Sequence, residues 1–224
     1  LENPDSNLAT EIISSDGVIL GKYFEKNRSQ LKYSDLPKNL VDALVATEDV
    51  RFYEHSGIDG RGTLRAVFSL GTSGGASTLT QQLAKQLFHG EGSKFLPFRI
   101  VQKIKEWIIA IRLERQYTKN EIIAMYCNVY DFGNYSVGVS SAAQTYFSKA
   151  PKDLTIDESA ILVGMFKNSG LYNPVKNPQG VKNRRNVVLS QMEKGGIITE
   201  GQKEKLQALP ITLKFKLESH REGT

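Results

Sequence analysis

The chain has 224 residues, of which 40% are hydrophobic and 24% are charged, and its formal net charge is +5 with an isoelectric point near 9.1. These values allow one substantial globular core, and the basic balance favours anionic partners: nucleic acid, an anionic membrane surface or a phosphorylated substrate. The single cysteine, Cys127, excludes an internal disulfide and a cysteine-cluster metal site. No apolar run reaches the roughly 18 to 20 residues that span a bilayer, and no signal-peptide pattern opens the chain, which begins with Leu; we therefore expect a fragment or a processed form that lacks its anchor.

The first predicted element is a β-hairpin, and the chain then becomes helical. Residues 10–24, TEIISSDGVILGKYF, place two β-prone runs on either side of Ser-Asp-Gly, which is typical of a hairpin. Pro37 suits the first turn of the helix that follows. The apolar stripe of that helix has helical spacing and consists of Leu40, Val41, Leu44 and Val45.

Capping signals predict that most of the remaining chain is helical. Four Thr residues are each followed three positions later by Gln or Glu, ahead of an amphipathic run: Thr78 and Gln81, Thr118 and Glu121, Thr155 and Glu158, Thr199 and Gln202. The patterning divides the chain into an N-terminal hairpin and linker region at 1–35, a main domain at 36–208 and a C-terminal tail or linker at 209–224. The predicted fold class is mainly α.

The segment 99–117 is predicted to form the central helix of the domain. Its apolar residues make one face and cover much of the rest: Ile100, Ile104, Trp107, Ile108 and Ile111, then Ile109, Ala110 and Leu113. A helix that is apolar nearly all round is usually buried at the centre of its domain. The loop before it, residues 89–98, carries Phe95, Leu96 and Phe98, which either pack inward or contact a membrane surface.

A candidate catalytic carboxylate lies in ATEDVRFYEHSG, residues 46–57. Glu48 follows Leu44 by four positions, so it continues the inward stripe of the first helix. Partial desolvation suits a carboxylate to proton transfer near neutral pH; the alternative is a helix-end glutamate in water. Asp49 and His55 are candidates to orient or charge-balance it, although both also resemble solvated loop residues.

Glu106 is a second carboxylate, set inside the apolar segment 99–117 with Lys103 and Lys105 beside it. A buried acid is costly unless it is paired, so Glu106 either carries function or forms an ion pair with a lysine. Two such glutamates on different helices are compatible with glycosyl chemistry, in which an acid and a charged stabiliser flank the bond that forms or breaks.

Residues 71–86, GTSGGASTLTQQLAKQ, approach a helix through glycines. The helix start at Ser77 and Thr78 offers backbone N–H groups to an anion, and Lys85 adds a positive charge. The order of residues is not that of a P-loop, and a capped helix after a loop is the alternative. Arg184 and Arg185 in KNRRNVVL belong either to a solvated face or to a phosphate clamp.

Five blocks of this sequence, in order, resemble the five motifs of a known family. They are EDVRFYEHSG, GASTLTQQLAKQ, QKIKEWIIA, KNEIIAMYCN and RRNVVL, and they span residues 48–189. The family is the peptidoglycan glycosyltransferase domain, glycosyltransferase family 51, of class A penicillin-binding proteins and monofunctional peptidoglycan polymerases. Two positions depart from it: Gln102 stands where the family normally has Arg, and Gln86 where it commonly has Asn. Arg99, one turn before Gln102, offers a replacement positive charge.

The resemblance implies a lysozyme-like helical main lobe, a smaller membrane-facing jaw lobe and a short N-terminal hairpin. It implies that lipid II is polymerised into β-1,4-linked glycan, with Glu48 as general base and Glu106 as the second catalytic residue. Gln81, Gln82, Tyr126 and Asn128 resemble scaffolding of the cleft more than reacting groups. The implied substrate-binding residues are Asp49, His55, Ser77, Thr78, Gln81, Gln82, Lys85, Arg99, Lys103, Lys105 and Asn128.

The resemblance also implies partners and a location. The expected partners are lipid II with its growing glycan chain, a membrane surface and a C-terminal transpeptidase domain in the full-length protein, but no nucleic acid. The expected location is the outer face of the bacterial cytoplasmic membrane. A divalent cation, Mg or Mn, is an open expectation near Glu106, and no organic cofactor is expected. Two alternatives stay open: a lysozyme-like hydrolase or lytic transglycosylase, and a non-catalytic basic module that binds a membrane or nucleic acid.

Overall fold

The computed structural model describes residues 10–13, 19–23, 31–68, 77–88 and 96–217. Its elements in chain order are β1 (Thr10–Ile13), β2 (Ile19–Tyr23), η1 (Tyr33–Asp35), α1 (Lys38–Glu48), α2 (Gly60–Phe68), α3 (Leu79–Phe88), α4 (Leu96–Gln116), α5 (Lys119–Val129), α6 (Gly138–Phe147), η2 (Pro151–Asp153), α7 (Ile156–Met165), α8 (Pro178–Lys194) and α9 (Glu200–Ala208). The prediction of a mainly α fold is confirmed.

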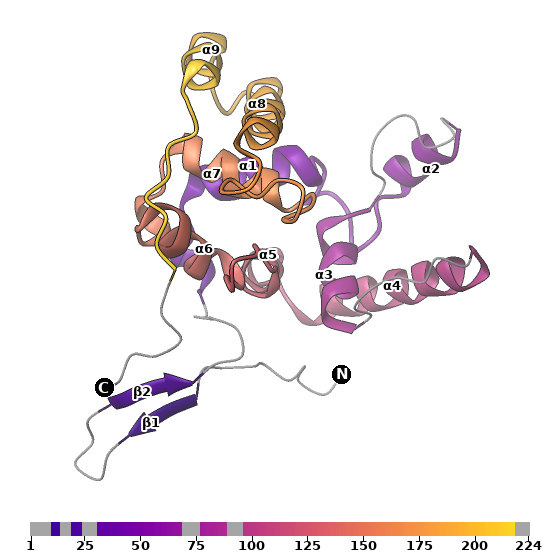
Figure 1. Ribbon diagram of the computed structural model, residues 1–224. Coiled ribbons are helices and arrows are strands. Elements are labelled where there is room, and N and C mark those ends of the chain that lie inside the picture. Colours follow the sequence, from indigo (N-terminus) through magenta and orange to yellow (C-terminus); the bar gives the residue numbers. More distant parts are fainter. Residues whose placement is uncertain (1–9, 14–18, 24–30, 69–76, 89–95, 218–224) are drawn as a thin grey trace.

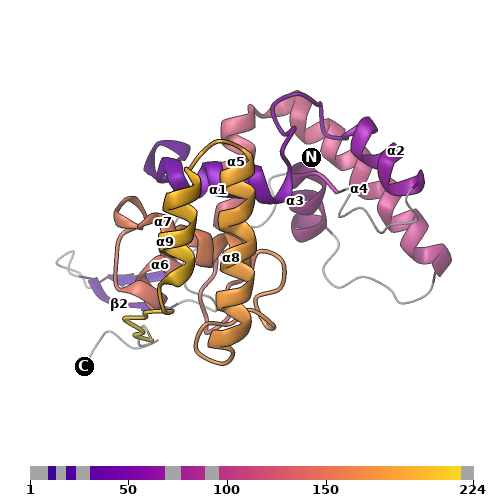
Figure 2. The ribbon, with the colours of Figure 1, turned by 90° about the horizontal axis from the view of Figure 1, so that it is seen from above.

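The helices form two lobes (Figure 1). The main lobe contains α1 and α5 to α9, and the small lobe contains α2 and α4, which extend to one side of it in both ribbon views (Figures 1 and 2). Helix α3 packs against both α4 and α5, so it joins the two lobes. The strands β1 and β2 pair antiparallel below the main lobe, and Thr10 lies opposite Tyr23. The predicted main lobe, smaller lobe and N-terminal hairpin are all present; the Ser-Asp-Gly turn lies outside the described residues.

The core of the main lobe forms around α7. Every residue from Ser159 to Met165 is buried, and α7 packs against α1 and α8. Helix α1 adds the stripe predicted from its spacing, because Leu40, Val41 and Leu44 are buried. Aromatic side chains close the core toward α5: the ring of Phe166 lies 4.7 Å from that of Tyr126.

The capping predictions are confirmed for three helices and half confirmed for the fourth. Thr118, Thr155 and Thr199 form complete capping boxes with the residue three positions later. The Thr78 hydroxyl accepts a hydrogen bond from the backbone N–H of Gln81 at 3.1 Å. The Gln81 side chain donates to the Gly57 carbonyl. Only the Thr78 half of this capping box is therefore present.

The prediction that segment 99–117 is the central helix is wrong. Its isoleucine face is about half exposed: Ile100 56%, Ile104 49% and Ile108 47%. From Arg99 onward, the buried residues of α4 are instead Glu106, Ala110 and Leu113, which form a narrow stripe at helical spacing. Among the described elements, α4 packs mainly against α3 and, less extensively, against α5. No helix among the described residues is long and apolar enough to span a membrane.

The segment after α9 is irregular in structure but is packed against the main lobe. Residues 210–217 contain no helix or strand. The backbone N–H groups of Lys214 and Lys216 donate to the carbonyl oxygens of Tyr146 and Thr145 in α6, at 3.0 and 2.9 Å. The described part of the predicted tail therefore contacts the domain, and the division of the chain at residue 209 stays a prediction. Of the predicted loop at 89–98, residues 96–98 belong to α4, and residues 89–95 lie outside the described residues.

Candidate active site

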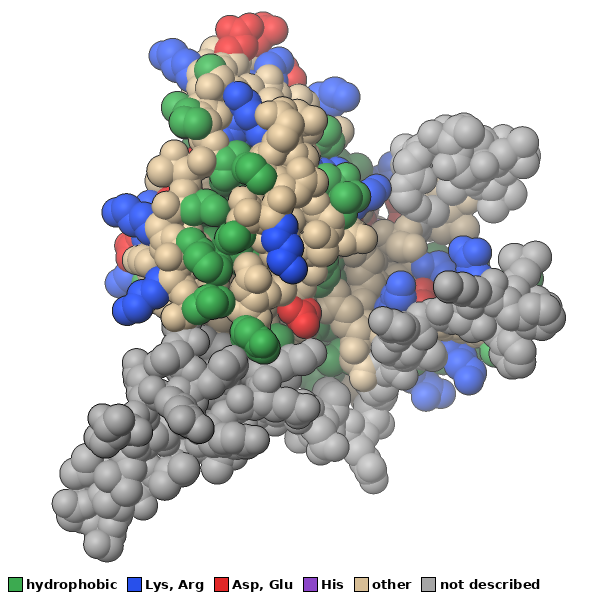
Figure 3. Space-filling view, viewed as in Figure 1, with side chains coloured by type: hydrophobic (Ala, Val, Ile, Leu, Met, Phe, Trp, Pro, Cys, Tyr) green, Lys and Arg blue, Asp and Glu red, His purple; other side chains and the backbone are tan. Residues whose placement is uncertain are grey.

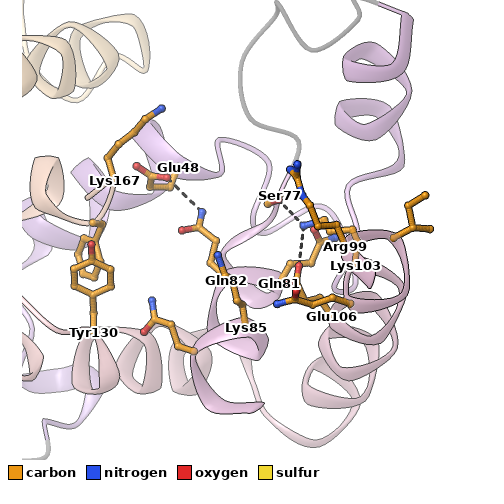
Figure 4. Close-up of a pocket in the computed structure, with 14 residues that line it drawn as sticks. Glu48, Ser77, Gln81, Gln82, Lys85, Arg99, Lys103, Glu106, Tyr130 and Lys167 are labelled. Carbon is orange, nitrogen blue, oxygen red and sulfur yellow. Dashed lines mark hydrogen bonds and ion pairs between the residues drawn. The ribbon is translucent and has the colours of Figure 1, made fainter. Parts of the chain in front are cut away.

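A cleft of about 950 Å³ opens where α1, α3, α4 and the end of α7 meet (Figure 4). Its lining is polar at both ends and contains two carboxylates, Glu48 and Glu106, and four cationic side chains. The lining residues are Glu48, Ser77, Gln81, Gln82, Lys85, Gln86, Arg99, Ile100, Gln102, Lys103, Glu106, Tyr130, Phe166 and Lys167. The surplus of positive charge suits an anionic ligand.

Glu48 is the last residue of α1, and each of its carboxylate oxygens has one partner. The Arg184 guanidinium, from α8, lies 3.0 Å from Oε1. The Gln82 side-chain amide, from α3, donates to Oε2 at 3.3 Å. Only 14% of the Glu48 side chain is exposed, so three helices fix a carboxylate that still opens into the cleft. The expectation that Glu48 continues the inward stripe of α1 is met, and its pairing with Arg184 was not foreseen.

Tyr126, on α5, supports the Glu48 end of the cleft through Gln82. Its hydroxyl donates to the side-chain oxygen of Gln82 at 2.8 Å, which leaves the Gln82 amide nitrogen directed at Glu48. Burial raises the pKa of Tyr126 well above its ordinary value, and the nearby Glu48 carboxylate raises it further. The phenol therefore stays a hydrogen-bond donor, as expected of a scaffolding residue.

Glu106 lies on α4 at the opposite end of the cleft (Figure 4). It is 6% exposed, and its Oε2 lies 3.0 Å from the ammonium of Lys103. The same ammonium donates to the Ser77 hydroxyl at 2.7 Å. The ion pair that the sequence left as one alternative is thus present, and because both partners line the cleft, the pair also orients a cation toward any bound ligand.

The lining between the two carboxylates comes from α3 and the first turns of α4. Gln81 is buried, whereas Lys85 and Arg99 are exposed and reach the cleft from different helices. Gln102, which stands in place of the Arg typical of the resembling family, lies in the lining together with Arg99. Arg99 therefore places a positive charge at the end of the cleft where Gln102 has none.

Five of the expected substrate-binding residues are outside the lining: Asp49, His55, Thr78, Lys105 and Asn128. Asp49 is buried and accepts the backbone N–H of Leu79 at 2.9 Å, and His55 Nε2 lies 3.0 Å from it. These two residues hold the N-terminus of α3 from behind the cleft. Asn128 bonds both backbone groups of Leu31 at 2.8 Å, and Lys105 is exposed on another side of α4.

Thr78 belongs to a contact that joins the small lobe to α3. Its hydroxyl donates to the Gly57 carbonyl at 2.7 Å, and the Gln81 side chain donates to the same oxygen at 3.4 Å. Gly57 has φ +90°, and a Cβ atom there would lie 2.8 Å from the carbonyl carbon of Ala110 in α4. Only glycine allows the loop to approach both helices this closely.

Several supporting residues were not found from the sequence. Lys167 and Tyr130 line the cleft beside Glu48, and burial raises the pKa of Tyr130 to about 12. Behind α3, Glu114 accepts from the Thr80 hydroxyl at 2.5 Å and pairs with Lys119 at 2.6 Å. No local signal marks them, because Thr80 lies 34 positions before Glu114 and the cleft lining comes from several separate segments.

Arg184 and Arg185 have different roles, and neither lies on a solvated face. Arg184 reaches Glu48, and its side chain is 13% exposed. Arg185 is fully buried and contacts Asp157 of α7 at 2.9 Å. Sequence spacing placed them together in one block, but consecutive residues on a helix point in different directions.

The two-lobed helical fold, with two glutamates and four cationic side chains in its cleft, suits a glycosyltransferase domain. A family model described as Transglycosylase matches residues 16–193, and the chain belongs to this family.

Relatives of known name agree with this assignment. Penicillin-binding protein 1A of Vibrio cholerae is 40% identical over 92% of this chain and 25% of its own length. Penicillin-binding protein 1A of Escherichia coli is also 40% identical, over 92% of this chain and 24% of its own length. The crystal structure of penicillin-binding protein 1A from Haemophilus influenzae matches 95% of this chain and 22% of its own, with a TM-score of 0.54 and 26% identity. The chain thus spans about a quarter of the length of these relatives.

Proposed function

We propose that this chain is a peptidoglycan glycosyltransferase that polymerises lipid II into β-1,4-linked glycan strands and releases undecaprenyl pyrophosphate. The observation that carries the proposal is Glu48, a carboxylate fixed by α1, α3 and α8 at the edge of a cationic cleft in a chain of the Transglycosylase family. A base held in this way needs little reorganisation when it accepts a proton.

Glu48 is the general base in this proposal. The acceptor is the 4-hydroxyl of the N-acetylglucosamine of lipid II, and the donor is the growing chain on undecaprenyl pyrophosphate. The acceptor oxygen forms a bond to the anomeric carbon, on the face opposite the pyrophosphate, while the bond from that carbon to the phosphate oxygen breaks. The hydroxyl proton passes to Glu48 and the bonding electrons leave with the pyrophosphate, so the anomeric configuration inverts. Arg184 and Gln82 hold the carboxylate in place during this step.

The other end of the cleft receives the leaving group. Lys103, Lys85 and Arg99 place positive charge where the pyrophosphate departs, which lowers the energy of the charge that develops there. Glu106 contributes by fixing the Lys103 ammonium at 3.0 Å.

A divalent cation at this end is part of the proposal, and the donor set limits how it would be held. The described residues contain no group of three His, Cys, Asp or Glu side chains that could hold a metal ion. Glu106 and the Ser77 hydroxyl are the oxygen donors nearest Lys103. Mg²⁺ is commonly bound by one or two carboxylates together with substrate phosphates, so Glu106 would hold the ion jointly with the pyrophosphate. The chemistry supplied would be neutralisation of the departing charge.

We further propose that α4 contacts the membrane that carries the lipid substrate, at the outer face of the cytoplasmic membrane. The α4 apolar face, defined as Ile100, Val101, Ile104 and Ile108, is about half exposed. Lys and Arg side chains gather on the small lobe (Figure 3), and cations on the same lobe as exposed apolar groups suit an anionic lipid surface. The remaining part of the full-length protein would carry a transpeptidase domain, as the name of the relatives suggests.

The decisive experiment is the Glu48→Gln variant in a lipid II polymerisation assay. We expect the rate of glycan formation to fall about 1,000-fold, because the amide keeps the shape of the side chain but cannot accept the proton. Glu54→Gln is the matched control, since Glu54 is exposed and follows Glu48 by six positions. A Glu48→Gln variant with near-normal polymerisation would rule out the proposed role. Soluble muropeptides released from purified sacculi would instead indicate a glycan-cleaving enzyme.

Membrane contact is tested separately by flotation with vesicles that contain phosphatidylglycerol. The double variant Ile104→Ser and Ile108→Ser removes apolar area from the middle of the α4 apolar face, and we expect vesicle binding to weaken about tenfold. Leu171→Ser is the control, because Leu171 is 54% exposed on the main lobe. Equal binding by the α4 variant and the native chain would contradict this contact.

A further inference from the structure

Arg185 is a fully buried charged side chain that does not face the cleft. Its guanidinium lies 2.9 Å from the Asp157 carboxylate of α7. It also donates to the backbone carbonyls of Gln207 at 3.2 Å and Leu209 at 2.8 Å, where α9 ends. A buried guanidinium is costly unless it is paired, so the ion pair to Asp157 and the two hydrogen bonds tie α7, α8 and the end of α9 into one unit.

The chain that leaves α9 runs along α6, and we call residues 209–217 the C-terminal strap. Apolar and polar side chains alternate along its later part, and Ile211 and Leu213 pack against the core of the main lobe. The backbone carbonyl of Lys214 accepts the Ser148 hydroxyl at 2.8 Å. The strap is therefore held by Arg185 where it begins and by α6 along its length.

Arg184, the residue before Arg185, reaches Glu48 from the same helix. Consecutive helical residues are separated by about 100° around the axis, so one arginine contacts the strap and the other crosses α7. The crossing is tight, since a Cβ atom at Gly164 would lie 3.0 Å from the Arg184 side chain. Arg184 then ends 3.0 Å from Glu48. A small rotation of α8 would therefore move the guanidinium of Arg184 relative to Glu48.

We propose that Arg185 and the C-terminal strap are positioning elements for the Arg184–Glu48 pair. The bonds of Arg185 to Asp157 and to the start of the strap set the rotation of α8, and this rotation places the Arg184 guanidinium on the catalytic carboxylate. The inference rests on the proposed function of Glu48 as general base. It assigns a catalytic consequence to a segment that lies outside the cleft.

A double-mutant cycle tests whether Arg185 acts through Arg184. Lysine keeps the charge of Arg185 but lacks the planar fork that contacts a carboxylate and two carbonyls together. We expect Arg185→Lys to lower the kcat of lipid II polymerisation about tenfold in the native chain, and less than about twofold in an Arg184→Gln background. A tenfold loss in both backgrounds would show a general structural effect and overturn the proposal. If Arg185→Lys does not fold, Leu213→Ala replaces it in the same cycle.

A second measurement needs no substrate. The ¹⁵N resonance of the Arg184 side-chain Nε is recorded in the native chain and in Leu213→Ala, with Leu217→Ala as the control because Leu217 is 53% exposed at the end of the strap. We expect the Arg184 resonance to shift in Leu213→Ala and to stay in place in Leu217→Ala. An unmoved resonance in Leu213→Ala would contradict the coupling. A native chain that forms no glycan would instead contradict the proposed function, so the two failures are distinguishable.

Discussion

Glu48 and Glu106 both face the cleft, but they are held in different ways. Glu48 accepts one hydrogen bond on each oxygen, from Arg184 and Gln82, and its partners come from segments far along the chain. Glu106 pairs with Lys103 on its own helix, three positions earlier. The first carboxylate is fixed by tertiary structure, and the second mainly fixes a cation beside it. In the proposed function, the carboxylate fixed by distant segments accepts the proton, and the one paired on its own helix serves charge stabilisation.

Apart from Glu48→Gln, the largest loss of activity is expected for Glu106→Gln, at the other end of the cleft. Its amide no longer attracts the Lys103 ammonium, so the charge that faces the leaving group is less well placed. We expect kcat/KM to fall about 100-fold, which is less than for Glu48→Gln, because one electrostatic contact is weakened while the base stays intact. Steady-state kinetics with lipid II measure kcat/KM for both variants. A loss equal to or greater than that of Glu48→Gln would reverse the assignment of roles.

A smaller effect is expected for Lys103→Met on the binding of inorganic pyrophosphate, used as a competitive inhibitor. The variant keeps a long side chain but removes one positive charge, and we expect the inhibition constant to rise about tenfold. Lys105→Met is the matched control, since Lys105 is exposed on α4 outside the lining. Equal effects of the two variants would mean that the net charge of α4, rather than the position of Lys103, controls binding.

The smallest expected effect concerns stability in acid at the small-lobe end of the molecule. Partial burial raises the pKa of Asp59, but the Arg51 guanidinium and the Gly62 N–H outweigh burial and hold this pKa below its ordinary value. A lowered pKa in the folded state means that this stabilisation is complete above the ordinary pKa and is lost as the pH falls from there through the lowered, folded-state pKa. We expect the Asp59→Asn variant to lose about 1 kcal/mol at neutral pH and to show a shallower fall in the free energy of unfolding between about pH 5 and pH 3. Urea unfolding at several pH values measures how the free energy of unfolding changes with pH in the native chain and in Asp59→Asn. Identical slopes in the two proteins would contradict a lowered pKa for Asp59.

The sequence predicted those parts of the fold that depend on neighbours within a few positions. The capping boxes at Thr118, Thr155 and Thr199 and the buried stripe of α1 follow from spacing alone. The same spacing directed Glu48 inward. A short-range pattern suffices here because a helix repeats every 3.6 residues and its caps are local hydrogen bonds.

The tertiary structure decided which apolar faces are covered and which distant side chains meet. Periodicity marked the isoleucines of α4 as apolar, but only the packing against α3 determined that the stripe of Glu106, Ala110 and Leu113 is the buried one. Glu48 meets Arg184 across 136 positions of the chain, and Arg185 reaches the start of the C-terminal strap. The physical reason is that burial and ion pairing depend on the element that packs opposite, and no single segment encodes the identity of that element.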